Sequence, residues 1–128
     1  MHEFSLAEGL ARELLRIARE HKASAVREVY VSIGALSGIV RESFSFGFEI
    51  IKEHEPMLKE SQLHIEVDYP TYRCGQCGYL IERSSVVPAQ CPMCNGIEFY
   101  PSGGDDLKIM RVELDLEEET SGGGNEHV

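Results

Sequence analysis

Two pairs of cysteines constrain this chain more than any other feature. The four residues are Cys74 and Cys77, then Cys91 and Cys94, and the sequence contains no other cysteine. Each C-x-x-C pair places two thiolates on one tight turn, so two facing turns surround a single ion with four sulfurs. This is the closed tetrahedral site that structural Zn²⁺ prefers, and it leaves no coordination position for catalysis. The spacing therefore predicts a zinc-ribbon-like module built on four cysteines.

Other uses of the four cysteines stay open at this point. Two disulfides would be typical of an oxidising compartment. Iron held by the same four sulfurs would make a rubredoxin-like electron carrier, and the sequence alone does not separate iron from zinc. A zinc ribbon that serves only as an interaction module is a further alternative.

Length and charge narrow the class of protein. A chain of 128 residues is about one domain with a small insert. No apolar run is long enough to span a bilayer and no leader-like segment begins the chain, so we expect a soluble, cytoplasmic protein without a membrane partner. The net charge of −10 repels phosphate backbones, which argues against nucleic acid as a partner.

The sequence also gives no sign of an enzyme. It shows no Ser/His/Asp arrangement, no phosphate-binding loop and no metal site with an open position beside a general base. We therefore expect a protein that binds metal without catalysing a reaction.

Hydrophobic periodicity predicts the remaining elements. A capping box at Ser5 and Glu8 precedes a helical pattern, which indicates a helix from about Ser5 to Lys22. A second helix is expected from about residue 41 to 54, where Pro56 follows. Alternating patterns predict strands near residues 25–33, 63–69 and 107–116. The last strand should be half-buried, with Met110, Val112, Leu114 and Leu116 on one face.

These elements predict an α+β fold, with two helices on a small three-stranded mixed sheet and the four-cysteine module as an insertion. We expect residues 1–70 plus 105–118 to form the α/β domain and residues 71–104 to form the zinc-binding module. Residues 119–128 are rich in glycine and acidic side chains, which predicts a disordered tail.

The first three residues, Met1, His2 and Glu3, form a second candidate metal site. A terminal amine, the His2 amide nitrogen and the His2 imidazole can close two fused chelate rings around one ion. Three such nitrogens in a plane select a square-planar ion, Ni²⁺ or Cu²⁺. The fourth ligand stays open between Glu3 and a distant group such as His54 or His64. A solvated histidine without a ligand role is the simpler alternative.

Several segments together resemble the HypA/HybF family of hydrogenase nickel-incorporation proteins. They are the opening Met-His-Glu-Phe-Ser-Leu-Ala, residues 31–37 (VSIGALS), residues 44–49 (FSFGFE) and the Tyr-Pro that precedes the first cysteine pair. The resemblance runs from Met1 to about Leu116. It is specific because the opening tripeptide and the four cysteines occur together.

The resemblance implies a nickel metallochaperone. At the matching positions, Met1, His2 and Glu3 would bind the transported Ni²⁺, and the four cysteines would bind structural Zn²⁺. The implied partners are a HypB-type GTPase and the large subunit of [NiFe]-hydrogenase, and some family members also serve urease maturation proteins. We expect a monomer or a weak homodimer.

Overall fold

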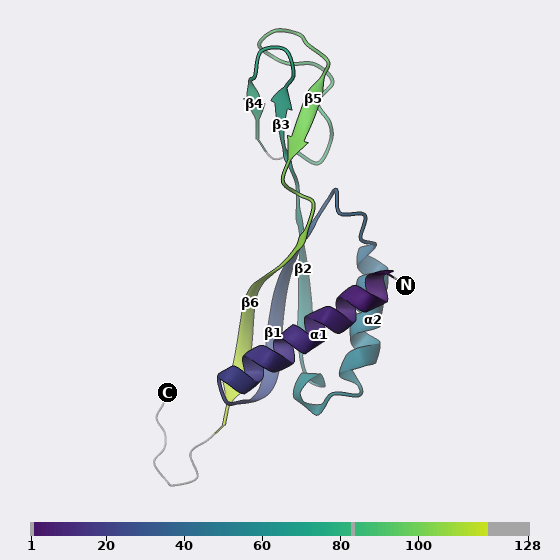
Figure 1. Ribbon diagram of the computed structural model, residues 1–128, viewed down its shortest axis with the longest axis vertical. Coiled ribbons are helices and arrows are strands. Elements are labelled where there is room, and N and C mark those ends of the chain that lie inside the picture. The colour runs from purple at the N-terminus through teal and green to yellow at the C-terminus, as the bar shows by residue number, and fades with distance from the viewer. Residues whose placement is uncertain (1, 83, 118–128) are drawn as a thin grey trace. The chain divides into compact units, whose positions relative to one another are not determined.

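The computed structural model describes residues 2–82 and 84–117, and these form two compact units (Figure 1). One unit contains the described residues up to Tyr30, Glu42–His64 and those from Arg111 onward. The other contains Val31–Arg41 and Ile65–Met110. The expected tail at 119–128 lies outside the described residues. The division into domains at residues 70 and 105 stays a prediction.

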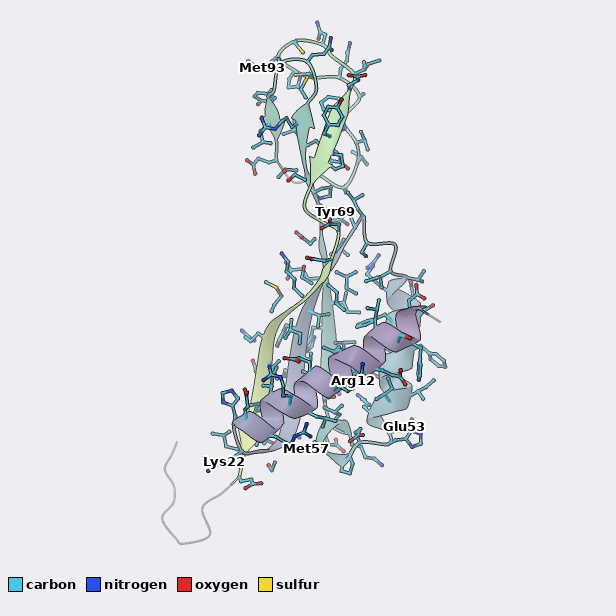
Figure 2. All side chains as sticks on the ribbon, in the orientation of Figure 1. Arg12, Lys22, Glu53, Met57, Tyr69 and Met93 are labelled. Atoms are coloured by element: carbon cyan, nitrogen blue, oxygen red, sulfur yellow. The ribbon has the colours of Figure 1, made fainter. Side chains whose placement is uncertain are left out.

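Helix α1 spans His2–Glu20 and begins three residues earlier than the capping box predicts. Ser5 therefore lies inside the first turns of the helix and is not its cap, so the predicted start is wrong. At the other end, the His21 amide donates to the Ile17 carbonyl oxygen over 3.1 Å. Lys22 then adopts a left-handed conformation with φ of 55°, which ends the helix (Figure 2).

Three strands form the larger sheet in the order β2-β1-β6. Strand β1 is Ala23–Gly34, β2 is Gln62–Asp68 and β6 is Leu107–Leu116. Near the start of the pairing, Tyr30 stacks on His64 with ring centroids 4.5 Å apart. Further along, the Ala35 amide donates to the Asp68 carbonyl oxygen over 2.8 Å. Residue numbers rise together along these contacts, so β1 and β2 run parallel.

Strand β6 runs antiparallel to β1. The Glu117 amide donates to the Lys22 carbonyl oxygen over 3.3 Å, and the Gly34 amide donates to the Asp106 carbonyl oxygen over 2.8 Å. Residue numbers rise along one segment and fall along the other. The sheet is therefore mixed, as the sequence predicts.

Helix α2 spans Arg41–Lys52, and the short 3₁₀ helix η1 spans Pro56–Leu58. The predicted start of α2 is confirmed, and the helix ends two residues before the predicted position. The apolar faces of both helices and the inner face of β1 supply the buried core, whose members include Ala7, Leu10, Leu14, Ala18, Val26, Val29, Val31, Ile33, Phe44 and Phe48. None of the described helices is both long and apolar enough to cross a membrane.

One expectation for β6 is wrong. Met110 is 60% exposed and Leu116 is 57% exposed, although the alternation placed both on one face with the half-buried Val112 and Leu114. Leu107 and Ile109 are half-buried, and so are Val112 and Leu114, so the inward positions change from odd to even numbers between 109 and 112. A strict period of two does not anticipate this change, which is why the phase assigned to Met110 fails.

The cysteine segment forms its own small antiparallel sheet in the order β4-β3-β5. Strand β3 is Thr71–Cys74, β4 is Leu80–Ile81 and β5 is Phe99–Ser102. The chain is thus an α+β protein with two helices on a mixed three-stranded sheet and an inserted four-cysteine module.

Candidate metal centre

The structure brings the four cysteine sulfurs into one cluster. The Sγ atoms of Cys74 and Cys94 are 3.6 Å apart, and those of Cys77 and Cys91 are also 3.6 Å apart. All four sulfurs lie within 4.8 Å of one another. These two 3.6 Å distances join sulfurs from different pairs, so the two turns face each other across a common point.

Three hydrogen bonds donated by backbone amides hold the first cysteine turn in shape. The Gln76 amide donates to Cys74 Sγ over 3.4 Å, and the Gly78 amide donates to the Cys74 carbonyl oxygen over 3.0 Å. The Cys74 amide donates to the Tyr79 carbonyl oxygen over 2.9 Å. Gly78 has a φ of 81°, which a residue with a Cβ rarely adopts. The turn therefore depends on glycine directly after the second cysteine.

The second turn repeats this geometry position by position. The Met93 amide donates to Cys91 Sγ over 3.4 Å, and the Asn95 amide donates to the Cys91 carbonyl oxygen over 2.8 Å. The Cys91 amide donates to the Gly96 carbonyl oxygen over 2.8 Å. Asn95 takes the left-handed position with φ of 64°, a conformation that Asn tolerates better than most residues. Met93, at the tip of this turn, is 67% exposed (Figure 2).

The cluster fits a tetrahedral metal ion and does not fit disulfides. Zinc bound to sulfur at about 2.3 Å implies sulfur–sulfur separations of about 3.8 Å in a tetrahedron. The separations of 3.6 Å between Cys74 and Cys94 and between Cys77 and Cys91 are close to that value. A disulfide requires about 2.05 Å, and all four cysteines are free. With four sulfur ligands, the site is closed to further ligands.

Backbone amides, burial and neighbouring sulfurs together set the affinity of the cysteine sulfurs for protons. The pKa of Cys74 falls to about 6 because the amides of Cys77 and Gln76 donate to its sulfur. The Gly96 amide acts to lower the pKa of Cys94, but burial and the three neighbouring sulfurs outweigh it and raise the pKa to about 12. The Tyr79 amide acts to lower the pKa of Cys77, but burial and the sulfurs of Cys91 and Cys74 outweigh it, so this pKa is also raised. A cation is therefore needed to hold all four sulfurs ionised together.

The amino-terminal candidates are described less completely than the four cysteines. Met1 and the side chain of His2 lie outside the described part of the chain. The backbone of His2 begins α1, and Glu3 follows it in the first helical turn. His54 and His64, the distant groups considered for a fourth ligand, belong to the same compact unit as α1. His64 Nε2 lies 2.6 Å from Glu28 Oε1, so its ring already has a carboxylate partner.

Sequence reasoning missed the two residues with left-handed backbone in the cysteine turns. Gly78 and Asn95 each follow the second cysteine of their pair, and each closes its turn through an amide hydrogen bond. A usable signal was present, because Gly and Asn are the residues that favour positive φ. Their occurrence at equivalent positions of both pairs marks two copies of one turn.

Residues 1–114 match a family model described as "Hydrogenase/urease nickel incorporation, metallochaperone, hypA". The hydrogenase maturation factor HypA of Campylobacter jejuni is 36% identical over 117 residues, which cover 89% of this chain and 99% of the relative. The hydrogenase maturation factor HybF of Escherichia coli is 31% identical over 115 residues, covering 90% of this chain and 100% of the relative.

Two solution structures share the fold. The nickel metallochaperone HypA of Helicobacter pylori has a TM-score of 0.64 and 21% identity, with 90% of this chain and 98% of that chain covered. A second HypA protein has a TM-score of 0.67 and 22% identity, with 91% and 98% covered.

Fold and cluster together define a small α+β metal-binding protein with an inserted four-cysteine module. The match over residues 1–114 is more specific: the chain belongs to the HypA family of nickel-incorporation metallochaperones, which act in hydrogenase maturation.

Proposed function

We propose that this protein binds Ni²⁺ through Met1, His2 and Glu3 and delivers it during maturation of [NiFe]-hydrogenase. Membership of the HypA family is the observation that carries this proposal, since the family model begins at residue 1 and its description names nickel incorporation. The opening Met-His-Glu supplies the nitrogen donors that a square-planar Ni²⁺ ion prefers.

The start of α1 at His2 supports this chelate. The first amide groups of a helix have no acceptor one turn earlier in the same helix. Coordination by the His2 amide nitrogen therefore competes with no hydrogen bond of the helical ladder of α1. A site at the end of a helix also has few protein contacts to break when the ion is handed over, as a carrier requires.

Zn²⁺ at Cys74, Cys77, Cys91 and Cys94 is proposed as the resident ion. The closed sulfur cluster supports a structural role, because a module of this size buries too little apolar surface to fold without a metal. Iron in the same cluster would give the purified protein a strong visible charge-transfer band. A colourless protein that contains zinc by elemental analysis would exclude that alternative.

A HypB-type GTPase and the large subunit of [NiFe]-hydrogenase are the proposed partners. Family membership in hydrogenase maturation supports both proposals. Service to urease is a further proposal, supported by the words "hydrogenase/urease" in the family description.

Calorimetric titration of Ni²⁺ into untagged protein tests the nickel proposal. We expect His2→Ala to lower nickel affinity by about 100-fold or more, because one imidazole closes a chelate ring. His21→Ala is the matched control, since His21 is an exposed histidine directly after the other end of the same helix. Equal affinity for the parent and the His2→Ala variant would refute nickel binding at this terminus.

A further inference from the structure

Gly47 lies where the first turns of α1 approach the backbone of α2. A Cβ atom on Gly47 would lie 3.1 Å from Cδ1 of Phe4, 3.6 Å from its Cα atom and 3.5 Å from Cβ of Ala7. The first distance is tighter than an ordinary van der Waals contact. Figure 1 shows the amino-terminal end of α1 beside α2, as these contacts require. The absence of a side chain at 47 therefore lets Phe4 rest on the backbone of α2.

The residues around this contact are buried. Gly47 is buried, and its neighbours Phe44 and Phe48 are fully buried on the same helix. On α1, Ala7 is also fully buried. Because Gly47 is buried, a side chain added there would displace a neighbour, and the nearest atom is Cδ1 of Phe4 in the first turn of α1.

This contact lies in the same turn as the early start of α1. Helix ends fray because their first residues gain few hydrogen bonds for the conformational freedom they lose. The local capping signal would begin the helix at Ser5, yet the helical backbone extends back to His2. Packing of Phe4 against Gly47 provides the tertiary contact that stabilises the additional residues.

We propose that Gly47 is a positioning residue for the amino-terminal nickel site. It admits Phe4 to the surface of α2, and Phe4 in turn holds the first turn of α1, so that the backbone of His2 and Glu3 is ordered before the ion arrives. The inference rests on the proposed nickel function. Gly47 itself does not touch the ion and acts only through Phe4.

The expected size of the effect follows from the population of the ordered turn. Apparent affinity falls in proportion to the fraction of molecules in the binding-competent conformation. If displacement of Phe4 leaves the first turn ordered in about one molecule in ten, apparent nickel affinity falls about tenfold.

Glycine substitutions on the two helices provide a matched test. Gly47→Ala adds a Cβ at the tight contact, and Gly47→Leu adds a side chain that the gap cannot hold while keeping a good helix former in α2. Gly9→Ala on α1 is the control, because the nearest atom to its Cβ is the flexible end of Arg12 at 3.9 Å. A fourth variant combines Gly47→Leu with Phe4→Ala. It adds a large side chain on α2 and removes one from the facing position on α1.

Two readouts are measured on each untagged variant. Hydrogen exchange of the amides at residues 5–7 reports the first turns of α1, and exchange at residues 14–18 reports the rest of the helix. Calorimetry reports nickel affinity. We expect Gly47→Leu to speed exchange at 5–7 alone and to lower nickel affinity about tenfold, with a smaller effect for Gly47→Ala. Gly9→Ala should show neither faster exchange nor weaker nickel binding. The double variant should recover part of both losses.

Unchanged exchange at residues 5–7 in Gly47→Leu would overturn the inference, as would faster exchange spread equally over residues 5–7 and 14–18. Faster exchange at 5–7 with unchanged nickel affinity would overturn it as well. The proposed function is judged separately by His2→Ala: if that variant binds nickel normally, the terminal site fails while the exchange data still report on the packing of Phe4.

Discussion

A Cβ atom placed on Gly34 would overlap the carbonyl group of Gly104, so the two residues meet backbone against backbone. Two hydrogen bonds join the segment 34–36 to 104–106: Gly34 N donates to Asp106 O over 2.8 Å, and Leu36 N donates to Gly104 O over 2.7 Å. Gly104 has a φ of 68°, so it too depends on the absence of a side chain.

Substitution of Gly34 by alanine should therefore be costly. The added methyl group would also lie 2.5 Å from the Asp105 amide nitrogen, and backbone cannot move aside as a flexible side chain can. We expect Gly34→Ala to lower the free energy of unfolding by about 3 kcal/mol. Urea denaturation followed by circular dichroism measures this. Gly9→Ala, with room for its methyl group, should be stabilising by up to about 1 kcal/mol, and equal stability of the two variants would contradict the prediction.

Loss of one sulfur ligand should affect the module and spare the helices. Cys77→Ser leaves three sulfurs, so we expect the zinc content of the purified protein to fall well below one ion per chain. Helical circular dichroism should persist, because α1 and α2 draw their buried faces from other residues. Elemental analysis and far-ultraviolet spectra give both values. A collapse of the helical signal would show that the module and the helices do not fold separately.

The left-handed residue in the second cysteine turn gives a matched pair of variants. Asn95 has a φ of 64°, which glycine adopts freely and a β-branched residue strongly resists. Asn95→Gly should retain zinc as the parent does, whereas Asn95→Val should weaken retention about tenfold, for a strain of about 1–2 kcal/mol. Competition with a coloured chelator measures the difference. Similar retention in both variants would mean that the turn relaxes without strain.

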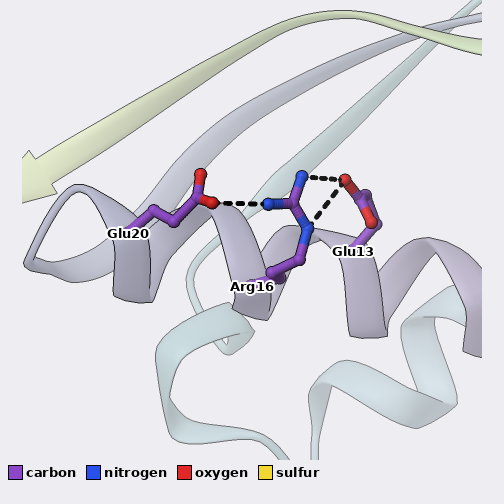
Figure 3. A network of polar contacts seen from close by, with 3 residues as sticks. All are labelled: Glu13, Arg16 and Glu20. Atoms are coloured by element: carbon purple, nitrogen blue, oxygen red, sulfur yellow. Dashed lines mark hydrogen bonds and ion pairs between the residues drawn. The ribbon is translucent and has the colours of Figure 1, made fainter.

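Arg16 bridges Glu13 and Glu20 on the outer face of α1, with its Nη1 atom 2.8 Å from Glu20 Oε2 (Figure 3). The hydrogen bond from Arg16 holds the pKa of Glu13 below its ordinary value. A depressed carboxyl pKa contributes stability above the unfolded-state pKa, and this contribution is lost as pH falls through the folded-state pKa. Carbon-13 NMR titration should show the depressed pKa, and Arg16→Gln should return it toward the ordinary value. A Glu13 pKa that does not change in Arg16→Gln would contradict the assignment.

Nickel affinity should depend on pH in the range where the terminal ligands titrate. An α-amino group and an imidazole have ordinary pKa values of about 7.7 and 6.5, and both must lose protons to bind a metal. We expect nickel affinity to fall about tenfold or more between about pH 8 and pH 6, as measured by calorimetry in buffers that do not bind nickel. A constant affinity over that range would exclude the amine and imidazole as ligands.

Several elements were predictable because their signal is local. Strand β6 has the predicted bounds, since its alternation is long, and α2 starts at the predicted Arg41. The C-x-x-C spacing predicted a four-sulfur cluster because the turn geometry lies within each pair. Met110 was misplaced because its orientation depends on a change of phase that alternation cannot report.

The sequence by itself determined the composition of this protein's sites: four cysteines in two equivalent turns, and a Met-His-Glu opening ahead of an amphipathic helix. Tertiary structure alone decided that the two turns face each other, with Cys74 Sγ 3.6 Å from Cys94 Sγ and Cys77 Sγ 3.6 Å from Cys91 Sγ, because these contacts join turns that are separated along the chain. It also decided where α1 begins. A capping box acts within one turn and would begin the helix at Ser5, whereas the helix begins at His2, where Phe4 lies against Gly47 of a different helix.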